Sequence, residues 1–263
     1  IFYRRYSASK VLRGSILILH GMGEHGGRYR ELAETLGQAG FEVTLPDLRG
    51  FGQSGGKRGC LRRFEDYFRD LDVIARSIKQ RSPDLPFFVL GHSFGGLIVS
   101  CWLAADAESK VRGLILTSPN FGIAIHVPVW RQALAVIASY LAPDYTQDNR
   151  VDSDFLTHDP SVFERYKMDR FNHHRISARL YHELTRKLAK KNTIAAQLKI
   201  PVLVLQAGDD HVVSKEDTLD FFEHLSGKDK ALEVFPGLYH EILNETNRQD
   251  IYAKISVWIL SHL

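Results

Sequence analysis

The sequence is poor in the residues that bind metals or cross-link a chain. Only two of its 263 residues are cysteines, Cys60 and Cys101, and neither has a second cysteine at C-x-x-C spacing. This scarcity predicts neither a disulfide framework nor a zinc site, and it favours a reducing compartment. The histidines between residues 158 and 182 have no cysteine or carboxylate at a ligand spacing, so we expect no bound metal.

Strong charge and long hydrophobic runs are also missing. The formal net charge is only +3 and no basic stripe is interleaved with aromatic residues, so nucleic acid is not an expected partner. The longest apolar stretch, residues 122–143, is interrupted by Pro128 and Arg131 and falls short of the ~20 residues that a membrane-spanning helix needs. The first residues show no signal-peptide pattern. We expect a cytoplasmic protein that contacts a membrane peripherally at most.

Short apolar runs alternate with longer helical patterns along most of the chain. The expected strands are residues 15–19, 41–45, 87–90, 113–117, 202–206 and 231–235. The expected helices are residues 28–39, 64–81, 95–105, 215–225 and 247–262. Such alternation predicts an α/β fold, with a mostly parallel sheet and helices on both of its faces. Residues 2–12 are expected to add an antiparallel hairpin at the edge.

The alternation stops between residues 120 and 192, where helical patterns continue without a convincing buried strand. This predicts an insertion over the sheet, residues 120–192, and a core of residues 1–119 and 193–263. The apolar first part of the insertion is either a helix packed on the core or a lid that lines an acyl pocket and touches a membrane. Residues 158–191 carry nine Lys or Arg against four acids, which fits a solvated helix surface or attraction to anionic lipid headgroups.

The most specific motif is Gly91-His92-Ser93-Phe94-Gly95. It follows the apolar run of residues 87–90 and precedes a helix of small and apolar residues, which is the strand-turn-helix context of a nucleophile elbow. The flanking glycines are needed because neighbouring backbones come too close for side chains around a strained turn. Ser93 is therefore the candidate nucleophile.

A serine hydroxyl needs a base, and the base needs an acid to fix its tautomer. In this context the acid and then the histidine follow the serine along the chain. His240 comes just after a predicted strand and is the candidate base, whereas the other downstream histidines lie beside the acid, within a helix or at the terminus. Asp209 and Asp210 both follow the strand of residues 202–206, and spacing alone allows either as the acid.

Four motifs together resemble the monoacylglycerol lipase and lysophospholipase family of α/β-hydrolases. They are H-G-x-G-E-H-x-G-R-Y at residues 20–29, D-x-R-G-x-G-x-S at 47–54, G-H-S-x-G-G at 91–96 and Y-H-E at 239–241. The resemblance implies an acid four residues after a strand-end glutamine, which is Asp210 when counted from Gln206. It also implies that residues 120–192 are a helical cap inserted after strand six of the family's sheet. The family's Q-G-x-x-D pattern has its glycine displaced here, so Asp209 stays an alternative.

The loop of residues 20–29 also matches a dinucleotide-binding pattern, through Gly21, Gly23 and Gly26 with Asp47 further on. Three features argue against it. The helical pattern begins only near Arg28, too late for its amides to meet a pyrophosphate. Glu24 would repel the phosphates. Asp47 belongs to the D-x-R-G motif and is therefore not expected to contact a ribose. A second match, starting at Gly50, has no helix directly after it. No organic cofactor is expected.

We interpret the same loop as one side of an oxyanion hole. Such a hole needs a free amide after His-Gly, which the Met22 amide supplies, and a second amide just after the nucleophile, which Phe94 supplies. The expected function is a serine hydrolase, with no cofactor or metal, that cleaves the ester bond of monoacylglycerols or lysophospholipids through an acyl-enzyme. A general short-chain carboxylesterase and a non-catalytic binding protein of the same fold are the alternatives. Dehalogenases and epoxide hydrolases are disfavoured, because they need an acidic nucleophile in place of Ser93.

Overall fold

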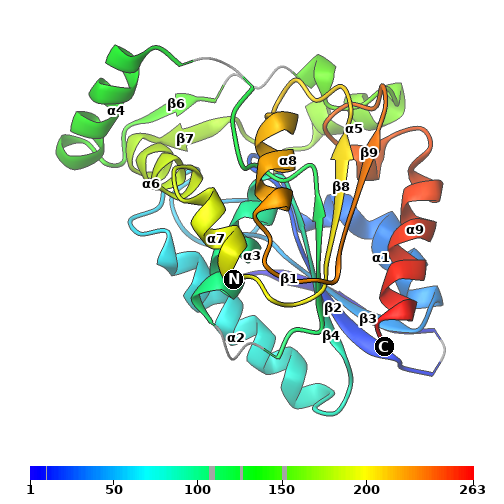
Figure 1. Ribbon diagram of the computed structural model, residues 1–263. Coiled ribbons are helices and arrows are strands. Elements are labelled where there is room, and N and C mark those ends of the chain that lie inside the picture. The colour runs from blue at the N-terminus through cyan, green and yellow to red at the C-terminus, as the bar shows by residue number, and fades with distance from the viewer. Residues whose placement is uncertain (10, 107–109, 125–126, 150–152) are drawn as a thin grey trace.

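A computed structural model describes residues 1–9, 11–106, 110–124, 127–149 and 153–263. Its main element is a seven-stranded sheet in the order β1-β3-β2-β4-β5-β8-β9, parallel except for the antiparallel edge strand β1 (Figure 1). The strands are β1 (Tyr3–Tyr6), β2 (Gly14–Leu19), β3 (Phe41–Pro46), β4 (Phe87–His92), β5 (Gly113–Thr117), β8 (Val202–Ala207) and β9 (Lys230–Phe235).

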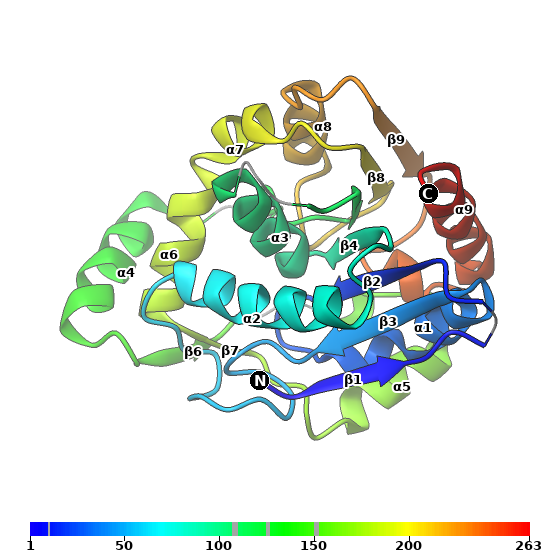
Figure 2. The same ribbon diagram turned by 90° about the horizontal axis from the view of Figure 1, so that it is seen from below.

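Helices cover both faces of this sheet because its inner strands are apolar on both sides. On β2, Ile16 and Ile18 join the hydrophobic cluster of one face, while Leu17 and Leu19 join the cluster of the other. Figure 2 shows α1 and α9 on one face and α2, α3, α7 and α8 on the other. Their bounds are α1 (Arg30–Gln38), α2 (Glu65–Arg81), α3 (Phe94–Ala105), α7 (Lys191–Gln197), α8 (Lys215–Glu223) and α9 (Arg248–Ser261). The prediction of an α/β fold is therefore confirmed.

The predicted antiparallel hairpin of residues 2–12 is wrong. Only β1 forms there, and it pairs with β3, a strand from outside this segment. Amides that follow β1 bond elsewhere instead of pairing with it. Ser9 N–H donates to the Gly37 carbonyl in the last turn of α1, and Arg13 N–H donates to the Gly40 carbonyl in the turn after that helix. The chain is thus held beside the α1–β3 turn before it enters β2.

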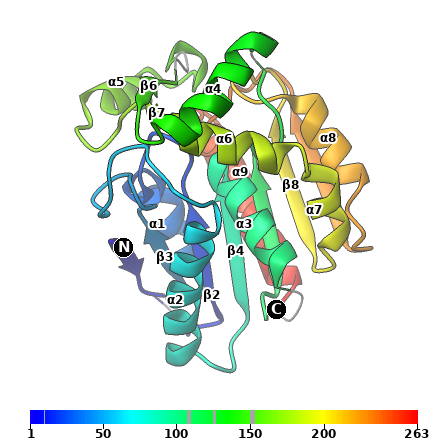
Figure 3. The ribbon, with the colours of Figure 1, turned by 90° about the vertical axis from the view of Figure 1, so that its left-hand side faces the viewer.

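The expected insertion follows β5 in this chain's own strand order and lies over the carboxyl ends of the parallel strands (Figure 3). Its elements before α7 are α4 (Val129–Leu141), β6 (Thr146–Asp148), η2 (Ser153–Phe155), α5 (Pro160–Met168), β7 (Arg175–Ser177) and α6 (Ala178–Leu188). The short antiparallel pair β6–β7 was not anticipated. Residues 125, 126 and 150–152 of the expected cap lie outside the described residues.

Helix α4 packs mainly on α6 and leaves its large apolar side chains in solvent. Trp130, Leu134, Ile137, Tyr140 and Leu141 are each more than half exposed. The interpretation of the apolar segment as a helix buried against the core is therefore wrong. Among the described residues, no helix is long and apolar enough to cross a membrane.

Candidate active site

Ser93 lies at the sharp turn between β4 and α3, in a backbone conformation that side chains rarely adopt. Its φ is 51° and its ψ is −120°. A Cβ on Gly91 would lie 2.7 Å from the Gly95 carbonyl oxygen, and a Cβ on Gly95 would lie 2.5 Å from the His20 carbonyl oxygen. Both glycines are thus required by close backbone approaches, as the motif predicted. The strain presents the Ser93 hydroxyl at the end of the strand.

His240 and Asp210 meet Ser93 from the ends of two other strands. The His240 Nε2 atom lies 2.9 Å from Ser93 Oγ, and His240 Nδ1 lies 2.9 Å from Asp210 Oδ2. Asp210 follows β8, His240 follows β9, and both side chains are almost fully buried. Asp209 instead pairs with His211 at 3.2 Å and is about half exposed. Of the two neighbouring aspartates, only Asp210 reaches the histidine.

Asp210 is held in place by three further hydrogen bonds. The Val212 and Val213 amides each donate to Asp210 Oδ1 at 2.9 Å, and the Gln206 Nε2 donates to Oδ2 at 3.2 Å. Burial alone would raise the pKa of Asp210, but the facing His240 and the Val212 and Val213 amides lower it below its ordinary value. The carboxylate therefore stays charged beside the imidazole.

The same pair shifts the pKa of the histidine in the opposite direction. Burial works to lower the pKa of His240, yet the Asp210 carboxylate outweighs it and raises the pKa above its ordinary 6.5. Next to it, the ring of His92 lies 4.9 Å from that of His240. Burial, and repulsion from His240, lower the pKa of His92 to about 3. His92 thus stays neutral, whereas the neighbouring His240 binds a proton more readily than a free imidazole does.

The loop of residues 20–29 approaches the nucleophile closely. A Cβ on Gly21 would lie 3.3 Å from Ser93 Cβ, so Met22 follows directly after the point of contact. His20 shapes this turn: Leu48 N–H donates to its Nε2 at 2.8 Å, so its Nδ1 carries the proton and donates to the Gly21 carbonyl at 2.7 Å. Phe94 is the first residue of α3, where helical amides have no partner within the helix.

Asp47 joins the two glycine-containing loops to each other. The fully buried carboxylate accepts hydrogen bonds from the Gly26 amide at 2.9 Å and the Gln53 amide at 2.8 Å, and Arg4 pairs with it at 2.9 Å. A Cβ on Gly52 would lie 2.3 Å from it. Asp47 therefore serves to hold these loops together.

A buried ion network behind the site was missed by the sequence interpretation. Arg28 pairs with Glu24 at 2.6 Å and with Glu241 at 2.5 Å, and all three side chains are nearly buried. Glu24 also accepts from the Gly21 amide and from the Tyr29 hydroxyl, both at 2.6 Å. Although burial would raise the pKa of Glu24, Arg28 and nearby histidines lower it. The network joins the Met22 loop to the residue after His240.

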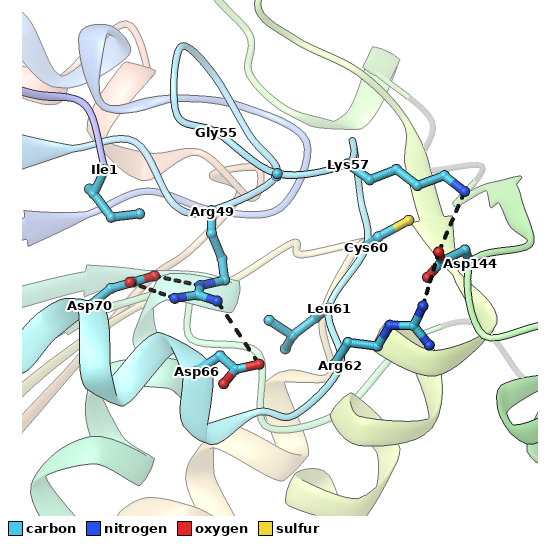
Figure 4. A pocket seen from close by; sticks show the side chains of 12 residues that line it. Ile1, Arg49, Gly55, Lys57, Cys60, Leu61, Arg62, Asp66, Asp70 and Asp144 are labelled. Carbon is cyan, nitrogen blue, oxygen red and sulfur yellow. Dashed lines mark hydrogen bonds and ion pairs between the residues drawn. The ribbon is translucent and has the colours of Figure 1, made fainter.

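A surface pocket of about 410 Å³ lies elsewhere, between the loop after β3, α2 and the turn after α4 (Figure 4). Arg49 pairs there with Asp70, and Lys57 and Arg62 both approach Asp144. The pocket is lined by Ile1, Arg49, Gly50, Gly55, Gly56, Lys57, Cys60, Leu61, Arg62, Asp66, Asp70 and Asp144. Its charges are paired, and burial raises the pKa of the Cys60 thiol, so it offers no activated nucleophile. Within the described ranges, no cluster of histidine, cysteine or acidic side chains is placed to hold a metal ion.

A strained serine elbow on a parallel sheet, facing a histidine that is paired with a carboxylate, defines the class of α/β-hydrolase-fold serine hydrolases. The sequence matches the family described as serine aminopeptidase, S33, over residues 10–247, and the chain belongs to that family. It is a serine hydrolase that cleaves carboxylic esters.

Two relatives and one solved structure support this placement. The chain is 35% identical to a phospholipase of Bacillus subtilis, over 90% of this chain and 91% of that protein. It is 33% identical to a monoacylglycerol lipase of Mycolicibacterium smegmatis, over 100% of this chain and 94% of that protein. The crystal structure of Paleococcus ferrophilus monoacylglycerol lipase is similar with a TM-score of 0.91 and 31% identity, covering 100% of this chain and 99% of the other.

Proposed function

We propose that Ser93, His240 and Asp210 form the catalytic triad of an esterase that acts on single-chain glycerides or lysophospholipids. The observation that carries this proposal is the pair of 2.9 Å contacts that His240 makes with Ser93 Oγ and Asp210 Oδ2. Ser93 attacks the ester carbonyl while His240 accepts its proton, and Asp210 stabilises the resulting imidazolium. His240 then returns the proton to the leaving alcohol.

The oxyanion of the tetrahedral intermediate is assigned to the Met22 and Phe94 amides. The close approach of Gly21 to Ser93 supports Met22, and the position of Phe94 at the start of α3 supports the second donor. A water molecule activated by His240 then attacks the acyl-enzyme, and the fatty acid leaves.

Residues 120–192 are proposed to act as a cap over this site, with residues 1–119 and 193–263 as the core. Two contacts of its second half support a covering position: His25 Nε2 lies 2.8 Å from Asp169 Oδ2, and the His173 amide donates to the Gly23 carbonyl at 2.9 Å. Leu180 and Leu184 of α6 belong to the same apolar cluster as Phe94, so apolar surface for an acyl chain lies beside the elbow.

Peripheral membrane contact is assigned to α4. Its exposed Trp130, Leu134, Ile137 and Leu141 provide the apolar side chains that an interfacial helix inserts. The basic residues of α6 and α7 contribute less to this than their number suggests. Lys187 pairs with Glu65, and Lys191 with Asp217 and Asp220, so part of their charge is neutralised by core acids.

A substrate panel tests the proposed specificity. Initial rates are compared for a monoacylglycerol, a lysophosphatidylcholine and p-nitrophenyl butyrate, each with the native protein and with Ser93→Ala. We expect the long-chain lipid esters to have the highest kcat/KM and the variant to be inactive on all three. A clear preference for the butyrate would instead identify a short-chain carboxylesterase, and equal turnover by Ser93→Ala would remove the proposed nucleophile.

A further inference from the structure

A fully buried carboxylate, that of Glu245, lies next to the loop of His240 although the triad does not use it. Its four hydrogen-bond donors come from both the His240 loop and the cap. The Tyr239 amide donates to Oε1 at 3.1 Å and the Thr246 amide to Oε2 at 3.2 Å. The His158 Nδ1 atom lies 2.7 Å from Oε1, and the His158 amide donates to Oε2 at 3.2 Å.

The cap segment of residues 156–158 fixes the backbone on both sides of His240. On one side, Tyr239 N–H is held by Glu245, whose carboxylate is shared with His158. On the other side, Glu241 N–H donates directly to the Leu156 carbonyl at 2.8 Å. The amides on both sides of the candidate base are therefore tied to this segment. Glu241 N–H bonds to it directly, and Tyr239 N–H is linked to it through Glu245.

Two side-chain contacts strengthen the junction. The imidazole of His158 stacks on the ring of Tyr239, with centroids 3.7 Å apart and planes 24° from parallel. Thr157 Oγ1 donates to the Asn244 carbonyl at 2.9 Å. The segment thus meets the His240 loop through carboxylate, backbone and aromatic contacts at once.

We propose that Glu245 is a positioning residue for His240, and that His158 couples the cap to it, so that the base is aligned only while residues 156–158 lie against its loop. The proposal rests on the triad proposed above. His240 must keep two 2.9 Å contacts at once, so a displacement of its backbone weakens proton transfer from Ser93 and the bond to Asp210 together. In this arrangement the position of the cap controls kcat by aligning His240. The surface that binds the substrate is left unchanged.

Kinetics of Glu245→Gln, His158→Ala and the double variant test this inference. Each single variant is expected to lower kcat by about 10-fold to 10²-fold with little change in KM, because misplacement of a reacting group costs rate more than binding. The double variant is expected to be no slower than Glu245→Gln, since His158 acts through Glu245. His158→Asn, which keeps a donor near the Nδ1 position, is expected to recover most of the rate.

Trp102→Phe is the matched control for a general loss of stability. It removes a part-buried hydrogen bond of 2.8 Å to Asp72, which joins α3 to α2 and involves no residue of the His240 loop, and it should leave kcat unchanged. A second readout is the downfield proton resonance of the Asp210–His240 hydrogen bond. It should move or broaden in Glu245→Gln and His158→Ala, and not in Trp102→Phe.

The proposal is overturned if Glu245→Gln and His158→Ala keep wild-type kcat and an unchanged resonance. It is also overturned if Trp102→Phe loses as much activity as Glu245→Gln and His158→Ala at equal thermal stability. A third contradicting result is a double variant whose loss in kcat is the product of the two single losses. Failure of the proposed triad would be recognised separately. In that case His240→Ala would retain activity, whatever the result for the Glu245 variant.

Discussion

At the scale of single residues, the neighbouring aspartates Asp209 and Asp210 show how strongly environment decides chemistry. Asp210 is buried and accepts from His240, Gln206 and two amides, while Asp209 lies near the surface beside His211. Their side chains are the same, but only one is placed to orient a base.

Replacing each aspartate by asparagine should separate them. Asp210→Asn is expected to lower kcat by about 10⁴-fold, because an amide cannot hold the productive tautomer or stabilise the imidazolium. Asp209→Asn should retain nearly full activity and serves as the control. The measurement is kcat on one ester under saturating conditions. Similar losses in both variants would contradict the assignment of the acid.

The raised pKa of His240 predicts the pH dependence of the rate. Only the neutral imidazole accepts the proton of Ser93, so activity is lost as the pH falls below the pKa of His240, which lies above 6.5. The kcat/KM profile should therefore rise with pH through an apparent pKa above that of free histidine. An acid limb with an apparent pKa below 6.5 would show that Asp210 does not govern the base.

Sequence motifs predicted Ser93 and His240 because each stands in a short local pattern at a strand end. Spacing alone could not separate Asp209 from Asp210, because it does not show which side chain turns inward. The preference for Asp210 came from the resemblance to the family's pattern after Gln206. The Arg28–Glu241 pair joins residues 213 positions apart. No local pattern could have revealed it, although Arg28 already belonged to the H-G-x-G-E-H-x-G-R-Y motif.

At the scale of elements, α4 is the helix whose amino-acid pattern departs furthest from a packed one. Its large apolar residues lie outward, and the buried Ser139 and partly buried Ala135 and Ala138 lie on its less exposed side. Small residues allow close approach to α6, and the outward residues remain available to a lipid surface.

Charged substitutions on α4 should weaken vesicle binding without affecting the chemistry. Each of Leu134→Glu and Ile137→Glu is expected to reduce partitioning onto phospholipid vesicles by about tenfold, because burial of one such side chain contributes roughly 1.5–3 kcal/mol. Val257→Glu, at an apolar position of α9 that is also more than half exposed, is the control. Cosedimentation measures the binding, and p-nitrophenyl butyrate turnover reports on the site. Unchanged binding in both α4 variants would contradict the membrane assignment.

The parallel strands of the main sheet were predicted well, whereas the helices and short strands of the insertion were given no bounds. The strand of residues 113–117 was predicted with its observed bounds, because a buried parallel strand gives a continuous apolar run. The β6–β7 pair has only three residues in each strand, too few for an alternating pattern to be recognised. The expected hairpin of residues 2–12 failed because the Ser9 and Arg13 amides donate to Gly37 and Gly40, distant residues that sequence alone does not identify.

At the scale of the whole molecule, the sheet brings together groups from the ends of β2, β4, β8 and β9. The parallel arrangement places all four carboxyl ends at one edge, beneath the proposed cap. Ser93 is 6% exposed and His240 4% exposed. Burial contributes to the shifted pKa values of the histidines at the site, and these shifts make the stability of the fold depend on pH.

Acid is expected to destabilise the fold through His92. Its pKa is about 3 in the folded protein and 6.5 ordinarily, so the stability it contributes is complete above pH 6.5 and is lost as the pH falls towards 3. His20 acts in the same direction, whereas His240, with its raised pKa, opposes them. Thermal midpoints measured between about pH 7 and pH 5 should fall less steeply for His92→Asn than for the native protein. His224→Asn, which replaces an exposed histidine, should keep the pH dependence of the native thermal midpoint. An equal change in His92→Asn and His224→Asn would contradict the role of burial.

The most direct test of the central claim, that Ser93 is a nucleophile activated by His240, is covalent labelling with a fluorophosphonate followed by intact mass. The native protein should gain one adduct at Ser93, Ser93→Ala should gain none, and His240→Ala should react far more slowly. Equal labelling of the native protein and Ser93→Ala, or no labelling of the native protein, would contradict the account.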